Sequence, residues 1–486
     1  MMQQEVFERA RKSRDPRFDG QFYIGVRTTG IYCRPICPAN TPNSENVTFF
    51  PTAAAASEAG YRPCLRCRPE CAPGTPAWSG TSTTVRRGLR LIANGVLDDS
   101  NVEDLATRLG VTSRHLRRLF TRHLGASPLA VAHTQRLHFA KQLIDQTRLP
   151  MQDIAVAAGY GSVRRFNDSF VKTYGRSPRE LRRAGDAAAA GDPDTVLTVR
   201  LPCRAPFDWP SLLGFFAARA VPGVESIDGD RYRRTVTIDG QPGVIEVRQD
   251  RGNVLLAMQG IGTQNIFPAV QRCREIFDLD APMQEIAAVL SQDAVLARLL
   301  RNNPGVRVPG AWDGFELAVR AVLGQQISVK AATTIAGRIA KAYGEPVKGN
   351  RGSGLTRLFP DAERLARARF NNMGITGSRA ATLRLLAHAV VDGSLSFDAS
   401  QDPVSFCESL RAIPGIGEWT AQYVAMRALK HPDAFPAADL GLLRAFDRPG
   451  RERLRPAQLE EMSQGWRPWR AYAALLLWSS APGSGG

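Results

Sequence analysis

The stretch Arg411–Asp439 restricts the folds open to this chain more than any other. It reads RAIPGIGEWTAQYVAMRALKHPDAFPAAD. An apolar periodic run meets Pro414 and the turn Gly415-Ile416-Gly417, and a second periodic run covers 418–430. This pattern predicts two short helices joined by a tight hairpin.

The predicted hairpin is suited to hold a phosphodiester. Gly415 and Gly417 allow a positive φ and a close approach of the backbone, so both are candidate DNA contacts. The second helix offers unpaired N–H groups and the positive end of its dipole to an anion. Such contacts grip the DNA backbone without reading bases.

The stretch resembles the helix-hairpin-helix of DNA base-excision glycosylases, in which an aspartate follows the second helix at the distance of Asp439. The resemblance implies that Asp439 is catalytic. An aspartate that only caps the next helix is the alternative interpretation. Trp419 occupies the position of the lysine of bifunctional members, so the resemblance implies an enzyme without a lyase step. It also allows a monovalent cation on the carbonyls of Arg411, Ile413 and Ile416.

Residues 195–480 resemble the alkylpurine glycosylase AlkA in four segments, namely FDWPSLLGF, AVLGQQISVKAA, the hairpin with Asp439, and RPWRAYAALLLW. Gln326 lies where this family inserts a wedge into the vacated base stack. The resemblance implies a base pocket lined by Phe215, Trp419, Tyr423 and Trp478. Any one of these aromatic residues could instead belong to the core.

The chemistry of base removal agrees with these residue types. N-alkylation makes a purine cationic and a good leaving group, and an electron-rich ring stacks well on it. A carboxylate near C1′ stabilises the oxocarbenium-like sugar that forms as the glycosidic bond breaks. We therefore expect excision of alkylated purines of the 3-methyladenine type, with Asp439 close to the sugar.

The length and charge of the chain point to several domains and a polyanionic partner. A chain of 486 residues is too long to fold around one hydrophobic core, and its length predicts about three domains. The net charge of +17 favours double-stranded DNA. No run of about 18 apolar residues and no signal peptide are found, so we expect a cytoplasmic protein without a membrane partner.

Four cysteines in residues 1–76 form two close pairs, Cys33-x3-Cys37 and Cys64-x2-Cys67. This layout predicts one tetrahedral Zn²⁺ bound by Cys33, Cys37, Cys64 and Cys67. A purely structural zinc site is one interpretation. A second follows from the segments TTGIYCRPICP, ENVTFF and GYRPCLRCRP, which resemble the N-terminal domain of the Ada methyl-acceptor family.

The Ada resemblance implies that Cys33 accepts a methyl group from a DNA methylphosphotriester. It places Thr29, Arg62 and Arg66 at the DNA backbone. Asn40 replaces a further arginine of the family, which reduces the expected phosphate affinity. No second acceptor motif of the PCHR type occurs, so O6-methylguanine repair is not expected.

Residues 84–183 contain an internal repeat in which LGVTSRHLRRLFTRHLGASP is echoed by AGYGSVRRFNDSFVKTYGRSP. Each copy predicts a helix-turn-helix whose second helix begins at a serine cap, Ser113 or Ser162, and a long helix near 128–147 joins the copies. The segment carries 18 basic and 8 acidic residues, an excess of 10. The candidate DNA-reading residues are Arg114, Arg117, Arg118, Arg164 and Arg165.

This segment resembles the AraC-type DNA-binding domain, which implies promoter DNA and RNA polymerase as partners. A basic helical bundle with solvated arginines is the alternative.

The sequence thus predicts a multidomain α+β protein. It comprises a small zinc α/β domain (1–76), an all-α double helix-turn-helix domain (84–183), a linker (184–194), an antiparallel α/β subdomain (195–281) and an all-α helix-hairpin-helix glycosylase core (282–486). The expected function is alkylation repair coupled to transcriptional control. The rival hypothesis is a regulator whose glycosylase-like half only grips DNA.

Overall fold

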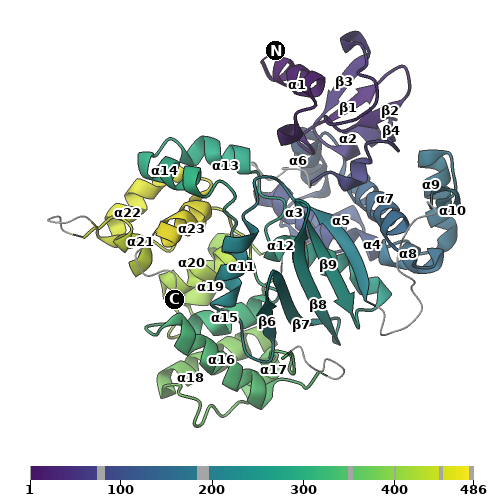
Figure 1. Ribbon diagram of the computed structural model, residues 1–486. Coiled ribbons are helices and arrows are strands. Elements are labelled where there is room, and N and C mark those ends of the chain that lie inside the picture. The colour runs from purple at the N-terminus through teal and green to yellow at the C-terminus, as the bar shows by residue number, and fades with distance from the viewer. Residues whose placement is uncertain are drawn as a thin grey trace. The chain divides into compact units, whose positions relative to one another are not determined.

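We analysed a computed structural model, which describes residues 2–73, 83–182, 196–347, 354–398, 401–447 and 453–480 (Figure 1). The chain forms two compact units. The first comprises Met1–Cys203 with Gly252–Gln271, and the second comprises Arg204–Arg251 with Arg272–Gly486. The predicted linker 184–194 lies outside the described residues. Within the described ranges, no helix is both long and apolar enough to cross a membrane.

The first unit begins with α1 (Met2–Ser13) and a four-stranded sheet of order β3-β1-β2-β4. β1 (Tyr23–Val26) runs antiparallel to β2 (Ile31–Cys33) and β3 (Val47–Phe50), whereas β4 (Arg62–Pro63) runs parallel to β2. Helix α2 (Ala53–Glu58) contacts all four strands. Because β2 and β4 are parallel neighbours, their carboxyl ends bring Cys33 and Cys64 together.

A helical segment follows, and it confirms the predicted repeat. Its helices are α3 (Thr83–Ala93), α4 (Val96–Asp99), α5 (Val102–Arg108), α6 (Ser113–Leu124), α7 (Pro128–Gln146), α8 (Met151–Ala157), α9 (Val163–Tyr174) and α10 (Pro178–Leu181). The pairs α5–α6 and α8–α9 are the two helix-turn-helix copies. The cap of α9 is Ser162, as predicted, but α6 is capped by Thr112 and not by Ser113, which is already helical. Thr112 has the extended backbone that a capping hydroxyl requires.

The predicted antiparallel strands are present. In the first unit, β5 (Leu197–Pro202) pairs with β9 (Asn253–Gln259). In the second unit, β6 (Glu225–Asp228), β7 (Arg231–Ile238) and β8 (Gln241–Asp250) form a meander after α11 (Trp209–Ala217). The four residues of β6 are too few to show alternation in the sequence. Helix α12 (Ile266–Ile276) follows β9.

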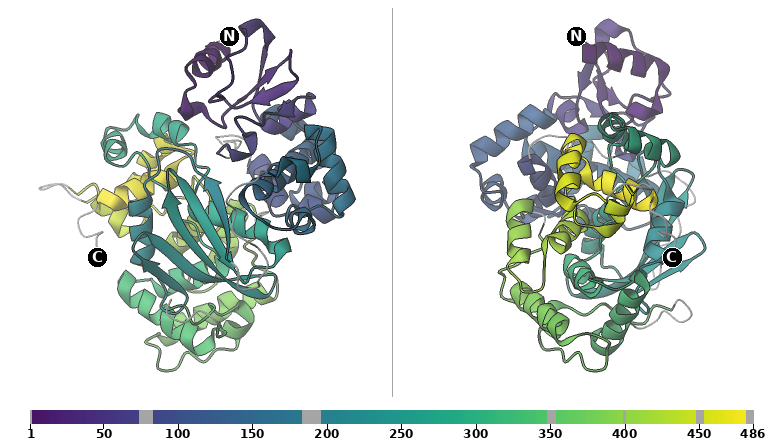
Figure 2. Two further views of the ribbon diagram at one scale, coloured as in Figure 1. Left: turned by 45° about the vertical axis from the view of Figure 1, so that its right-hand side comes forward. Right: turned by 90° about the vertical axis from the view of Figure 1, so that its left-hand side faces the viewer.

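The rest of the second unit is helical, as predicted (Figure 2). Its helices are α13 (Met283–Leu290), α14 (Ala294–Asn302), α15 (Gly314–Leu323), α16 (Val329–Tyr343), α17 (Ala362–Ala366), α18 (Gly377–Val391), α19 (Pro403–Arg411), α20 (Glu418–Arg427), α21 (Leu440–Arg444), α22 (Pro456–Met462) and α23 (Arg470–Ser480). The largely buried α15 contacts α16, α18 and α20. It is therefore the central helix around which the hairpin α19–α20 is placed.

Helix α7 joins the cysteine-bearing sheet to the helix-turn-helix copies. The Tyr32 hydroxyl and His138 Nε2 are 2.8 Å apart; Tyr32 is buried and His138 is partly buried. The Lys141 ammonium lies 2.5 Å from Asp145 and 3.7 Å from Glu70, with all three side chains 2–3 % exposed. Buried charges are tolerated only when they are paired in this way. The cysteine-bearing sheet and α7 therefore form a specific interface within the first unit.

This interface predicts acid sensitivity. Burial lowers the pKa of His138 to about 4, whereas an unfolded histidine has a pKa of about 6.5. The unfolded chain therefore binds the extra proton first, and the contribution of neutral His138 to stability is complete above about pH 6.5 and is lost as the pH falls toward 4. At pH 5 the loss amounts to about 2 kcal/mol. We expect the thermal unfolding midpoint of the first unit to decrease when the pH is lowered from 7 to 5. This decrease should be smaller in His138→Gln than in the wild type.

The exposed His388→Gln serves as the control, and it should retain the wild-type pH dependence. Equal acid sensitivity of the wild type and His138→Gln would contradict the assignment.

Candidate active sites

The four cysteines of the two pairs converge. The sulfur atoms of Cys33, Cys37, Cys64 and Cys67 all lie within 4.8 Å of one another. Tetrahedral Zn²⁺ with Zn–S bonds of about 2.3 Å needs sulfurs about 3.8 Å apart, so the donor set fits this ion. Cys33 and Cys37 are partly exposed, whereas Cys64 and Cys67 are buried. The backbone N–H of Arg34 donates to the Cys67 sulfur at 3.3 Å.

A cavity of about 440 Å³ opens beside Cys33. Thr29, Arg62 and Arg66, the predicted backbone-contacting residues, line it together with Asn40. Within the described ranges, no hydrogen bond or ion pair involves the guanidinium group of Arg62 or Arg66. The structure thus places two cations beside Cys33 with donors available for a phosphate.

Three more arginines line the same cavity and were missed in the sequence analysis. Arg34 forms an ion pair with Asp19 and donates to the Cys67 carbonyl at 3.0 Å, so its role is structural. Arg11 pairs with Glu8, and Arg14 donates to the Ala39 carbonyl at 3.0 Å. Arg34 directly follows Cys33, and Ala39 lies two positions after Cys37, but the cysteine spacing by itself does not predict these pairings.

The predicted DNA-reading arginines are all exposed on α6 and α9, the second helices of the two copies. Arg117 lies 3.6 Å from Glu103, and Arg164 lies 3.9 Å from Asp168. Exposed ion pairs of this kind contribute little to stability. Each arginine can therefore leave its carboxylate partner and bind DNA instead.

The turn between α19 and α20 has the glycine-dependent geometry expected of the hairpin. Gly415 has φ +92°, and a Cβ there would lie 2.1 Å from Thr382 Oγ1. Gly417 is the cap of α20 and has no side chain to occupy the first N–H groups, which leaves them available to an anion. The Ile413 carbonyl accepts from Ile416 N–H at 3.0 Å. The monovalent cation at this turn stays a prediction.

The Asp439 carboxylate accepts four hydrogen bonds. Oδ1 accepts from the backbone N–H groups of Gly441 and Leu442, at 2.8 and 3.0 Å, and from Trp478 Nε1 at 2.8 Å. Oδ2 accepts from Trp419 Nε1 at 2.7 Å. Asp439 thus does cap α21, as the alternative interpretation held, and it also contacts two indoles of the predicted base pocket.

Three of the four predicted aromatic residues, Trp419, Tyr423 and Trp478, lie at or next to this carboxylate. The rings of Trp419 and Tyr423 are stacked, with centroids 5.3 Å apart and an interplanar angle of 9°. Trp478 lies edge-on to Tyr423 at 6.3 Å. All three rings, and that of Phe215, remain partly exposed. Residues from α20 and α23 therefore meet beside Asp439, and none of them is fully buried.

Two arginines, the partly buried Arg219 and the buried Arg427, extend the aromatic cluster. The Arg219 guanidinium lies 3.9 Å from the Phe215 ring, and Arg427 lies 4.9 Å from that ring and donates to the Tyr423 hydroxyl at 2.6 Å. Burial lowers the pKa of Arg219. Burial alone would raise the pKa of Tyr423, but Arg427 and Arg219 lower it. Neither arginine was predicted from the sequence, although each follows an aromatic residue of the cluster by four positions.

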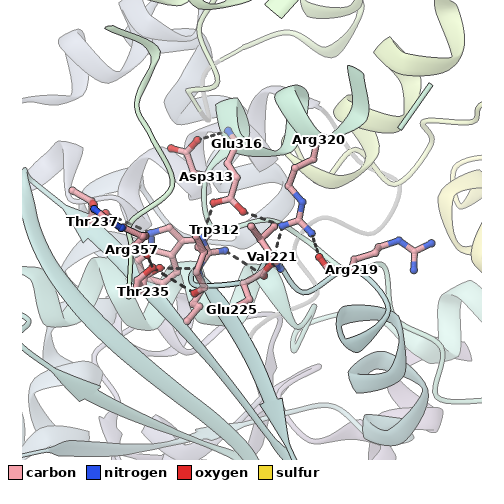
Figure 3. A network of polar contacts seen from close by, with 12 residues as sticks. Arg219, Val221, Glu225, Thr235, Thr237, Trp312, Asp313, Glu316, Arg320 and Arg357 are labelled. Atoms are coloured by element: carbon pink, nitrogen blue, oxygen red, sulfur yellow. Dashed lines mark hydrogen bonds and ion pairs between the residues drawn. The ribbon is translucent and has the colours of Figure 1, made fainter. Parts of the chain in front are cut away.

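A buried charge network fixes the end of α11 (Figure 3). Arg320 donates to the Arg219 carbonyl and, at 2.9 Å, to both Glu225 and Glu316. Arg234 donates to Glu316 at 2.7 Å. Two glutamates and two arginines balance one another here, which offsets part of the cost of burying them. The network holds the backbone that carries Phe215 and Arg219 in one position.

Four domain families match successive segments of the chain. These are "Metal binding domain of Ada" (7–70), "Helix-turn-helix domain" (105–184), "AlkA N-terminal domain" (198–313) and "HhH-GPD superfamily base excision DNA repair protein" (319–471). The first match and the four-sulfur cluster confirm the predicted zinc site. All four agree with the resemblances found in the sequence.

Three relatives illustrate the arrangement. The "Bifunctional transcriptional activator/DNA repair enzyme Ada" of Escherichia coli is 32% identical over 36% of this chain and 48% of its own length. The "DNA-3-methyladenine glycosylase 2" of Escherichia coli is 34% identical over 57% of this chain and 94% of its own length. The "Probable bifunctional transcriptional activator/DNA repair enzyme AlkA" of Mycobacterium tuberculosis is 43% identical over 97% of this chain and 95% of its own length. The chain therefore belongs to the family of bifunctional transcriptional activator/DNA repair enzymes AlkA.

Proposed function

We propose that the protein repairs alkylated DNA by two reactions and controls transcription in response. The second unit excises alkylated purines of the 3-methyladenine type by hydrolysis, and Cys33 in the first unit accepts a methyl group from methylphosphotriesters. The observation that carries the excision proposal is the Asp439 carboxylate, which the indoles of Trp419 and Trp478 hold beside partly exposed aromatic rings.

The two oxygens of Asp439 have different capacities. Oδ1 already accepts three hydrogen bonds, whereas Oδ2 accepts one, from Trp419. Oδ2 therefore retains a lone pair for the sugar. As the C1′–N bond breaks, its electron pair moves to the base, the cationic purine becomes neutral, and positive charge develops on the sugar. The negative charge of Asp439 stabilises that cation until water adds to C1′.

The neighbouring side chains serve base extrusion. Trp419 and Tyr423 offer stacked electron-rich rings to a cationic purine, which favours the flipped-out state. An indole forms no Schiff base, so Trp419 at the lysine position supports an enzyme without lyase activity. Gly415 and Gly417 supply backbone contacts to the phosphates of double-stranded DNA.

Methyl transfer at Cys33 follows from the same physical chemistry. The Cys33 sulfur attacks the methyl carbon, the S–C bond forms, the C–O bond breaks, and the phosphodiester leaves as an anion. Bound Zn²⁺ keeps the sulfur deprotonated at neutral pH. Thr29, Arg62 and Arg66 line the cavity in which they would hold the phosphate. Methylation removes one negative charge from the four-thiolate site and so weakens its repulsion of DNA.

The regulatory part of the proposal rests on the arrangement of the first unit. The sheet that carries Cys33 contacts α7, and α7 joins the two helix-turn-helix copies. A change of charge at Cys33 therefore occurs in the same compact unit that carries the arginines of α6 and α9. We infer promoter DNA as the ligand of those helices and RNA polymerase as the protein partner.

The excision proposal predicts that Asp439→Asn in the full chain lowers the rate of 3-methyladenine release from duplex DNA at least 100-fold, because the stabilising charge is lost. Asp293→Asn is a matched control. Asp293 also accepts from two backbone N–H groups, of Val295 and Leu296, and from an indole, of Trp466 at 3.2 Å, but away from the aromatic cluster. It should keep the wild-type rate.

Wild-type activity in Asp439→Asn would remove this carboxylate from the reaction. A wild-type protein that releases no base would favour the rival, a regulator whose glycosylase-like unit only grips DNA.

The acceptor proposal predicts that mass spectrometry detects one added methyl group on Cys33 after exposure to methylphosphotriester DNA. Cys33→Ser should show none, because a serine hydroxyl is a poor nucleophile at neutral pH. Cys71→Ser should react like the wild type, because Cys71 lies outside the four-sulfur cluster. Methylation of a different cysteine, or of none, would refute the assignment.

A further inference from the structure

The loop between α15 and α16 has an unusual backbone at its tip. Gln326 is exposed and has φ +59°, a left-handed backbone conformation that residues other than glycine rarely adopt. Such a conformation costs about 1 kcal/mol or more and persists only where surrounding contacts enforce it. The loop therefore needs an anchor.

Gln325, the preceding residue, supplies the anchor. Its side-chain Nε2 donates to the Gly415 carbonyl and to Thr420 Oγ1, both at 3.0 Å. Its backbone carbonyl accepts from the Arg379 guanidinium at 2.5 Å. The side-chain amide of Gln325 thus contacts the hairpin turn and α20, and its backbone carbonyl contacts α18.

Helix α18 holds the hairpin turn as well as the loop. Thr382 donates to the Pro414 carbonyl at 2.9 Å and packs against Gly415, where no side chain would fit. Arg379 and Thr382 are three residues apart, so they lie on one face of α18. The same face therefore fixes the turn and, through Arg379, the loop.

We propose that Gln325 is a positioning residue that couples the DNA-gripping hairpin to the Gln326 tip. It holds that tip in the left-handed conformation before DNA binds, so that Gln326 enters the base stack as the damaged nucleotide leaves it. The inference rests on the proposed glycosylase function and adds how this chain makes a polar wedge effective. Preorganisation removes the ordering cost that a mobile glutamine would otherwise have when it replaces the extruded base.

The chemistry of the anchor requires an amide. Both side-chain contacts of Gln325 are donated to oxygen atoms, one of which, the Gly415 carbonyl, can only accept. A glutamate at position 325 would have the same size but would face that carbonyl with a negative charge. Gln325→Glu therefore tests the hydrogen bonds without removing the side chain.

The test compares excision of 3-methyladenine by the full chain from two DNAs, a fully paired duplex and the same duplex with mismatches flanking the lesion. Wedging limits the rate only where the base must be extracted from an intact stack. Gln325→Ala and Gln325→Glu should each lower the rate on the paired duplex about tenfold and on the mismatched duplex less than twofold. The exposed Gln292→Ala should match the wild type on both.

A double variant separates coupling from a purely structural role. If Gln325 acts through the tip, Gln325→Ala combined with Gln326→Ala should be no slower on paired DNA than Gln326→Ala alone. Equal losses on both DNAs, multiplicative effects in the double variant, or an unchanged rate would each overturn the proposal. A wild-type protein that excises base from neither DNA would instead refute the glycosylase function, and the anchor with it.

Discussion

Four hydrogen bonds to one carboxylate organise the proposed active site of the second unit. Asp439 closes the first turn of α21 with Oδ1 and receives an indole on each oxygen. The backbone contacts fix its position, because a capping side chain has little freedom, and the N-terminus of a helix favours its negative charge. The indoles bring α20 and α23 to the same point. Capping and the proposed catalytic role are therefore two uses of one geometry.

The other parts of this unit hold the surroundings of that carboxylate. The buried network of Glu225, Glu316, Arg234 and Arg320 ends on the Arg219 carbonyl and fixes the aromatic wall at α11. On the DNA-gripping side, α18 and Gln325 fix the hairpin and the neighbouring loop. Charged and polar groups with several partners each are costly to displace. In the proposed function, the reaction takes place between two walls whose positions are set before DNA arrives.

The sequence predicted those features that are encoded locally. Cysteine spacing predicted the zinc site, the repeated segments predicted the two helix-turn-helix copies, and the glycine turn predicted the hairpin. Asp439 was singled out by the family resemblance, and its catalytic role stays a prediction. Several features that the sequence did not predict depend on pairs distant in sequence. Gln325 meets Gly415 across 90 positions, and Tyr32 meets His138 across 106. Such pairs have no periodicity, so only the folded chain shows them. Strand β6 was not predicted because its four residues are too few to show the alternation of polar and apolar side chains.

Asp293 shows why the local motif alone does not define a catalytic residue. It caps α14 through the same two backbone N–H contacts and accepts from the indole of Trp466. Trp466, however, is 2 % exposed, whereas Trp419 and Trp478 keep part of their rings open. A sugar and a flipped base need that open surface, and the indole beside Asp293 offers none. The difference between a capping carboxylate and a candidate catalytic one therefore lies in the accessibility of the rings around it.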